Sequence, residues 1–139
     1  MISANPGSPV RPLAKIASGG ELSRVMLALK TVLGESDSVE TMIFDEIDTG
    51  IGGEVAVSVG QHIKKLATKK QIFCITHLAS IAVCADTQIK IEKSVENRET
   101  STRVYEITGE QRVEEIARML SGDAVNEVSR EHARSLLHF

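Results

Sequence analysis

Two short apolar segments restrict the fold of this 139-residue chain more than any other feature of its sequence. Residues 41–44 read Thr-Met-Ile-Phe and residues 71–76 read Gln-Ile-Phe-Cys-Ile-Thr, lengths that suit buried strands. Between them, residues 54–68 repeat apolar side chains at helical spacing. This order predicts a β-α-β unit with two parallel strands and a right-handed crossover. Because neither strand alternates with polar residues, we expect both faces of this α/β sheet to be covered.

Polar side chains follow both predicted strands at the same end. Asp45 and Glu46 come directly after the first strand, and His77 comes directly after the second. Parallel strands end at one edge of a sheet, and ligands bind at that edge in open α/β folds. The topology therefore predicts two carboxylates and an imidazole on one rim. The alternatives left open are a solvated loop start for the acidic pair and a structural role for the histidine.

A glycine-rich helix start precedes the first strand. Ser18-Gly19-Gly20-Glu21 leads into residues 22–33, where apolar side chains recur on more than one side, so we expect a helix buried on more than one face. Ser18 is suited to be the N-cap, and Glu21, three residues later, completes a capping box. Free backbone N–H groups at such a start attract anions, and glycines let a phosphate approach. A helix cap without a ligand is the alternative.

The rest of the chain predicts a hairpin and three helices. Residues 88–95 and 102–107 alternate apolar and polar side chains around a polar turn, which indicates an antiparallel pair. A short helix is expected before the hairpin and two helices after it, over 78–85, 111–120 and 123–137, with Gly122 ending the second.

Composition narrows the classes of function. Lys and Arg number 16 and Asp and Glu 19, a net charge of -3 that argues against a domain devoted to DNA phosphates. Aromatic residues make up only 3% of the chain, too few for a single-strand stacking platform. Cys74 and Cys84 lack partners at metal-ligand spacing and are expected to be buried reduced thiols. No apolar run reaches transmembrane length, so no membrane partner is expected.

Taken in order, these segments resemble the second half of an ABC-type nucleotide-binding domain. Residues 17–21 resemble the ABC signature loop, and residues 42–46 resemble a Walker B strand followed by its catalytic glutamate. Asp48 begins a segment similar to the D-loop, and residues 75–77 resemble the switch-histidine strand. Ala17 replaces the leucine that commonly opens the signature, and Glu21 replaces a frequent glutamine, as in SMC-like heads.

Within the SMC-like ATPases, the RecN family of bacterial DNA repair is the closer resemblance. It is carried by residues 17–24, 44–53 and 115–122. The sequence contains no Gly-x-x-x-x-Gly-Lys-Ser/Thr phosphate loop. The fold class implied is a P-loop NTPase-type ABC ATPase head with a partial sheet and flanking helices, lacking the Walker A strand and loop. Residues 1–139 would form its C-terminal lobe.

The resemblance also implies a role for each candidate site residue. Asp45 would orient Mg²⁺ through water, Glu46 would act as general base, and His77 would sense the γ-phosphate of ATP. Ser18, Gly19, Gly20 and Glu21 would contact, in trans, the nucleotide held by a second head. Asp48 would belong to the D-loop.

The partners implied are the N-terminal half of the same head, a second head in an ATP-sandwiched homodimer, and DNA bound by the full-length protein. The family places the protein in the bacterial cytoplasm, associated with the nucleoid. The ATPase would belong to the full-length dimer, and this chain alone would be inactive because it lacks Walker A. The alternatives are a head segment of another SMC-like or RecF-like ATPase and a non-catalytic dimerisation module.

Overall fold

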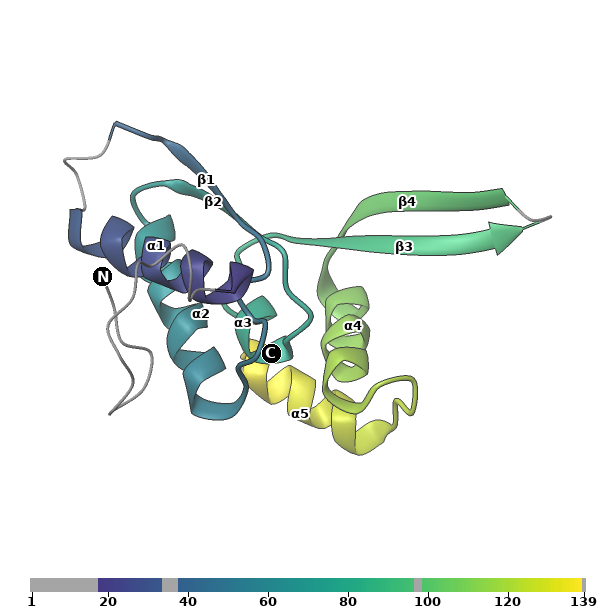
Figure 1. The fold of residues 1–139 in the computed structure, drawn as a ribbon. Helices are drawn as coiled ribbons and strands as arrows, with labels where there is room; N and C mark the ends of the chain where they lie inside the picture. The colour runs from purple at the N-terminus through teal and green to yellow at the C-terminus, as the bar shows by residue number, and fades with distance from the viewer. Residues whose placement is uncertain (1–17, 34–37, 97–98, 139) are drawn as a thin grey trace. The chain divides into compact units, whose positions relative to one another are not determined.

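The computed structural model describes residues 18–33, 38–96 and 99–138. The chain divides into two compact units, Met1–Thr76 and His77–Phe139. The elements, labelled in Figure 1, are α1 (Gly19–Leu33), β1 (Thr41–Phe44), α2 (Gly53–Ala67), β2 (Gln71–Cys74), α3 (Ala79–Ala82), β3 (Gln88–Glu96), β4 (Glu99–Ile107), α4 (Gly109–Ser121) and α5 (Glu127–Leu137).

The first unit contains the predicted β-α-β arrangement. Strands β1 and β2 pair in parallel, from Thr41 opposite Gln71 to Phe44 opposite Cys74. The pairing continues for one residue, since the amide of Ile75 donates a 2.9 Å hydrogen bond to the carbonyl of Phe44. Within the described ranges β2 pairs with β1 alone, so its other edge offers unpaired backbone groups.

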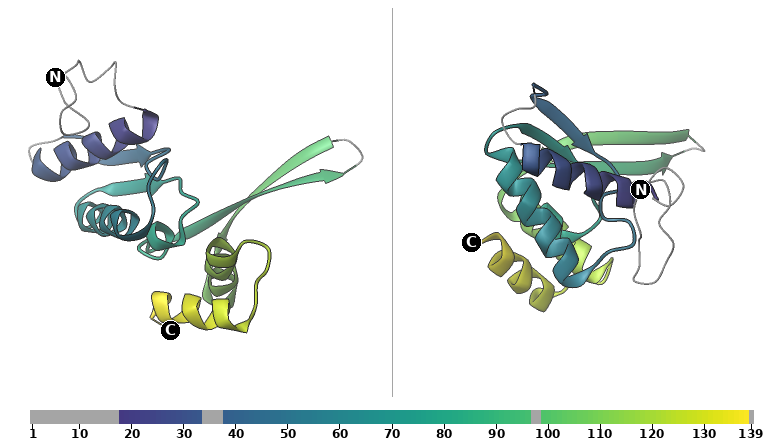
Figure 2. Two further views of the ribbon diagram at one scale, coloured as in Figure 1. Left: turned by 60° about the horizontal axis from the view of Figure 1, so that its bottom comes forward. Right: turned by 60° about the vertical axis from the view of Figure 1, so that its left-hand side comes forward.

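Only one face of this sheet is covered by the described residues, so the expectation of two covered faces is wrong for them. Met42 and Phe44 are buried, whereas Ile43, which points to the other face of β1, is 69% exposed. Helices α1 and α2 contact each other, and Figures 1 and 2 show both on the same side of the sheet. A face of a parallel sheet needs its own helical layer, and this unit provides one layer.

Helix α1 is likewise buried along a single stripe, which corrects the expectation of burial on more than one face. Leu27 is 4% exposed and Gly20 is buried, but Leu29 is 50% and Val32 84% exposed. The apolar side chains outside that stripe have no covering element among the described residues of this unit.

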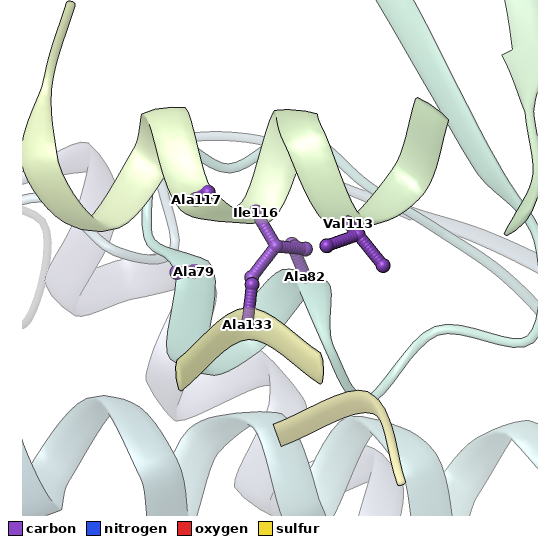
Figure 3. Close-up of a cluster of buried hydrophobic side chains, with 6 residues drawn as sticks. All are labelled: Ala79, Ala82, Val113, Ile116, Ala117 and Ala133. Carbon is purple, nitrogen blue, oxygen red and sulfur yellow. The ribbon is translucent and has the colours of Figure 1, made fainter. Parts of the chain in front are cut away.

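The core of the second unit is built from small and medium apolar side chains of three helices. Figure 3 shows the cluster, formed by Ala79, Ala82, Val113, Ile116, Ala117 and Ala133. Four of these six are alanines, which allow α3, α4 and α5 to approach closely. Cys84, in the same unit, is half-buried rather than fully buried as expected, and it forms no disulfide.

The end of the chain differs in detail from its prediction. Gly122, with a φ of 66°, ends α4 as expected. The last helix begins at Glu127 rather than at residue 123, because Asn126 caps it. The amide of Ser129 donates to Oδ1 of Asn126, and the amide of Asn126 donates to Oγ of Ser129, each over 3.0 Å.

The predicted hairpin is confirmed and is longer than expected. Strands β3 and β4 pair antiparallel from Gln88 opposite Ile107 to Glu96 opposite Glu99. Figure 2 shows them as a twisted two-stranded ribbon that extends away from α4. In the described part of the chain, no helix is long and apolar enough to cross a membrane.

Candidate functional site

The candidate site is a turn at the carboxyl end of β1. Asp45 and Glu46 are both exposed there. The amide of Thr49 donates a 3.0 Å hydrogen bond to the carbonyl of Glu46 and closes the turn. Glu46 has a φ of 56°, a left-handed conformation that costs a non-glycine residue about 1–3 kcal/mol. The surrounding contacts must therefore hold this residue in place.

The start of α1 lies directly against this turn. A Cβ atom on Gly20 would lie 2.6 Å from the carbonyl oxygen of Glu46 and 3.0 Å from Cβ of Thr49. A Cβ atom on Gly19 would collide with Oε2 of Glu46. Glycine is required at position 20, where a Cβ would meet the backbone of the turn, whereas the clash at Gly19 is with the movable end of the Glu46 side chain. The structure thus brings Gly19, Gly20 and Glu46 together within one chain.

The predicted capping box at the start of α1 is confirmed. The amide of Ser18 donates to Oε2 of Glu21 over 2.9 Å, and the amide of Glu21 donates to Oγ of Ser18 over 3.3 Å. The Glu46 carboxylate lies beside the positive end of the same helix, where negative charge is stabilised.

Two polar residues of α1 bind the backbone of the turn. Ser23 Oγ donates a 2.9 Å hydrogen bond to the carbonyl of Asp45. Arg24 Nη1 donates to the carbonyls of Ile47 and Thr49, each over 3.0 Å. The sequence pattern predicted a role for neither residue, although both fall inside the 17–24 motif. No spacing rule singles them out, because a polar residue on a helix most often faces solvent.

Asp48 lies inside the turn and is almost fully buried, at 3% exposure. Thr76, the second residue after β2, donates a 2.6 Å hydrogen bond from Oγ1 to Oδ2 of Asp48. This bond connects the turn to the end of β2. Burial, together with the negative charges of Asp48 and Asp45, raises the pKa of the Cys74 thiol to about 11. Cys74 is therefore protonated at neutral pH. It forms no disulfide, but it is half-buried rather than fully buried as expected.

His77 directly follows Thr76 and is exposed, at the start of the second unit. Its placement on one rim with Asp45 and Glu46 stays a prediction. Among the described residues, no three His, Cys, Asp or Glu side chains form a group that could hold a metal ion. A single carboxylate such as Asp45 is nevertheless consistent with Mg²⁺, which is usually held by one or two carboxylates, water and substrate phosphates.

The second unit carries a separate charged cluster around Glu115. Its carboxylate is bound by Lys90 Nζ at 2.9 Å and by Arg118 Nη2 at 2.6 Å. Burial acts to raise the pKa of Glu115, but the hydrogen bonds from Arg118 and Lys90 outweigh it and hold that pKa below its ordinary value. The cluster joins β3 to α4, and every charge in it is paired. It is accordingly a structural feature of the 115–122 motif.

Curated proteins show extensive similarity to this chain. It is 57% identical over 137 residues to the DNA repair protein RecN of Treponema pallidum, covering 99% of the chain. It is 51% identical over 135 residues to RecN of Deinococcus radiodurans and 44% identical over 137 residues to RecN of Bacillus subtilis, covering 97% and 99% of the chain. The chain spans about a quarter of the length of these relatives (24%, 23% and 24%).

Structural comparison agrees with the sequence comparison. A solved structure from work on the ATP-driven dimerization and DNA-stimulated activation of SMC ATPases matches with a TM-score of 0.55. The match covers 85% of this chain and 70% of the other at 20% identity, and it shows the fold. No protein-family model matches the chain. The chain is therefore similar to the DNA repair protein RecN over 97–99% of the chain's own length, and it shares its fold with a solved SMC ATPase structure.

Proposed function

We propose that this chain forms part of the ATP-binding and ATP-hydrolysing head of a RecN-like protein that acts in bacterial DNA double-strand break repair and recombination. One observation carries the proposal. The exposed pair Asp45 and Glu46, at the carboxyl end of β1, lies against the glycine-rich start of α1. The acidic pair suits the Mg²⁺ and water of one nucleotide, and the helix start suits the phosphate of another, so their contact joins two nucleotide sites.

In this proposal the acidic pair serves the nucleotide of its own head. Glu46 polarises the attacking water as general base, and Asp45 orients Mg²⁺ through water. The ion would neutralise charge on the ATP phosphates. His77 contacts the γ-phosphate, and its exposed position is compatible with that role. Asp48 is buried in the D-loop and holds its shape through Thr76.

The start of α1 serves the nucleotide of a second head. Ser18, Gly19 and Gly20 would clamp the γ-phosphate of that ATP, and Glu21 would keep Ser18 in place through the capping box. The Glu46 carboxylate lies over Gly19 in this structure. A phosphate arriving there would repel it, so binding of the second head's nucleotide would turn Glu46 away from Gly19.

The partners follow from this arrangement. The phosphate loop must come from the rest of the head, since the sequence lacks one. The exposed apolar side chains of α1 and of the open sheet face, among them Leu29, Ile43 and Phe73, support docking of that missing part. A second head completes each ATP site, DNA is bound by the full-length protein, and the site of action is the bacterial nucleoid.

Reconstitution tests this proposal. The chain and the remainder of the head, produced separately and then mixed, should hydrolyse ATP together while neither part does so alone. If the two parts form a stable complex that binds ATP but never turns it over, the chain is a docking module and the proposed catalytic role is wrong.

A further inference from the structure

Arg24, on α1, binds the backbone of the turn at two points. Its Nη1 group donates to two backbone carbonyls, those of Ile47 and Thr49, over 3.0 Å each. The two acceptors flank Asp48, in the turn that begins with the acidic pair. Ser23, its neighbour, holds the carbonyl of Asp45 over 2.9 Å. Two consecutive residues of α1 therefore hold three carbonyls within five residues of the turn.

These bonds act on a backbone that needs support. Glu46 adopts a left-handed φ of 56°, and Ile47 beside it is fully buried. Hydrogen bonds from a charged donor are stronger than those between neutral groups, and the two from Arg24 hold the backbone directly after Glu46 in place. Gly20 brings the helix so close that no side chain separates it from Glu46. The position of α1 thus determines where the turn, and the Glu46 backbone, can lie.

We infer that Arg24 is a positioning residue that couples the start of α1 to the catalytic turn. The inference rests on the function proposed above. When Ser18, Gly19 and Gly20 engage the nucleotide of a second head, Arg24 transmits any movement of α1 to the carbonyls of Ile47 and Thr49. Glu46 then reaches its working position only when the second head is engaged. Arg24 itself touches neither nucleotide nor water in this account.

The test compares two substitutions at Arg24 in the full-length protein. Arg24→Met keeps an apolar stem and removes the donors. Arg24→Lys keeps a cation that donates hydrogen bonds but lacks the planar fork. Lys30→Met, in the last turn of the same helix and about 9 Å further along its axis, is the matched control for loss of a cation. The readouts are kcat, KM for ATP, ATP-binding stoichiometry and thermal unfolding.

We expect Arg24→Met to lower kcat at least about tenfold, since small misplacements of catalytic groups have effects of that size or larger. The KM for ATP should stay within about threefold of the wild-type value. The ATP-binding stoichiometry should equal that of wild type. Arg24→Lys should recover a substantial part of the lost kcat, and Lys30→Met should stay near wild type. A loss of this kind reports the geometry of the turn, because misfolding would lower kcat and binding stoichiometry together.

The inference is overturned if Arg24→Met keeps kcat within twofold of wild type. It is also overturned if kcat and stoichiometry fall in parallel and lysine restores neither. Failure of the proposed function has a different signature: wild-type protein that binds ATP without hydrolysing it, or a Glu46→Gln variant as active as wild type. In that case the inference about Arg24 falls with the function, whatever the Arg24 variants do.

Discussion

Thr76 donates a 2.6 Å hydrogen bond to the carboxylate of Asp48, and this bond joins the ends of the two parallel strands. Asp48 lies two residues after Glu46, and Thr76 lies one residue before His77. The acceptor is 3% exposed, so the bond forms away from bulk water. The buried Asp48 therefore links the segment that carries Glu46, the proposed base, to the segment that carries His77, the proposed phosphate sensor.

Thr76→Val should lower the free energy of unfolding by about 1–3 kcal/mol, because it removes a donor to a buried charged acceptor while keeping the side-chain shape. Thr41→Val is the control, since Thr41 donates to Gln71 over 2.9 Å between two exposed residues. Urea unfolding of both variants measures the difference. Equal losses of unfolding free energy in the two variants would show that the bond to Asp48 stabilises the fold no more than an exposed hydrogen bond does.

Glu115→Gln should also destabilise the chain, by about 1–3 kcal/mol at neutral pH, because it weakens both bonds from Lys90 and Arg118. The pKa of Glu115 is held below its ordinary value of 4.5, so the carboxylate stabilises the fold above that pH. The gap between wild type and variant should therefore shrink as the pH falls through the lowered pKa.

Glu114→Gln provides the comparison, since Glu114 binds Arg130 over 2.6 Å but is 48% exposed at its side chain. Exposed pairs of this kind contribute little, so we expect almost no change in urea unfolding at any pH. A pH-independent loss in Glu115→Gln would contradict the assigned role of its charge.

The isolated chain should neither bind ATP tightly nor hydrolyse it. No phosphate loop occurs in its sequence, and the start of α1 alone offers only a few backbone donors. Calorimetric titration with ATP and Mg²⁺ measures this directly. Micromolar binding to the isolated chain would mean that these residues form a complete nucleotide site by themselves.

Ser18→Arg in the full-length protein should abolish ATP turnover without weakening the binding of ATP by each head. The added cation is bulky and stands at an exposed helix start, where it would block contact with a second head. Ser18→Ala removes the same N-cap, which costs about 1 kcal/mol of stability, but adds no bulk. It should therefore retain more ATP turnover than Ser18→Arg. If ATP affinity falls as much as turnover in Ser18→Arg, Ser18 acts in the pocket of its own head.

The local features of the site could be predicted because neighbouring residues determine them. The apolar runs at 41–44 and 71–76 led to the parallel pair, and Ser18 with Glu21 led to the capping box. Asn126 was a comparable signal that we missed. With Ser129 three residues later it caps α5, whereas the predicted helix began three residues before Asn126.

Features that depend on distant residues could not be predicted in the same way. The apolar character of β1 and α1 indicated burial, but periodicity does not say which element supplies the cover, and Ile43 and Val32 are exposed. The bonds of Ser23 and Arg24 depend on how α1 lies against the turn, more than twenty residues away in sequence. Tertiary packing determines which apolar side chains are covered and which carbonyls Ser23 and Arg24 bind.

Glu46 is proposed to activate the water that attacks ATP, and its removal should stop the reaction after ATP has bound. Steady-state ATP turnover and ATP affinity are compared for the full-length protein and its Glu46→Gln variant. The amide keeps the shape and loses the base, so turnover should fall about a hundredfold or more while ATP affinity is retained. A fall of less than threefold would show that Glu46 is not the general base.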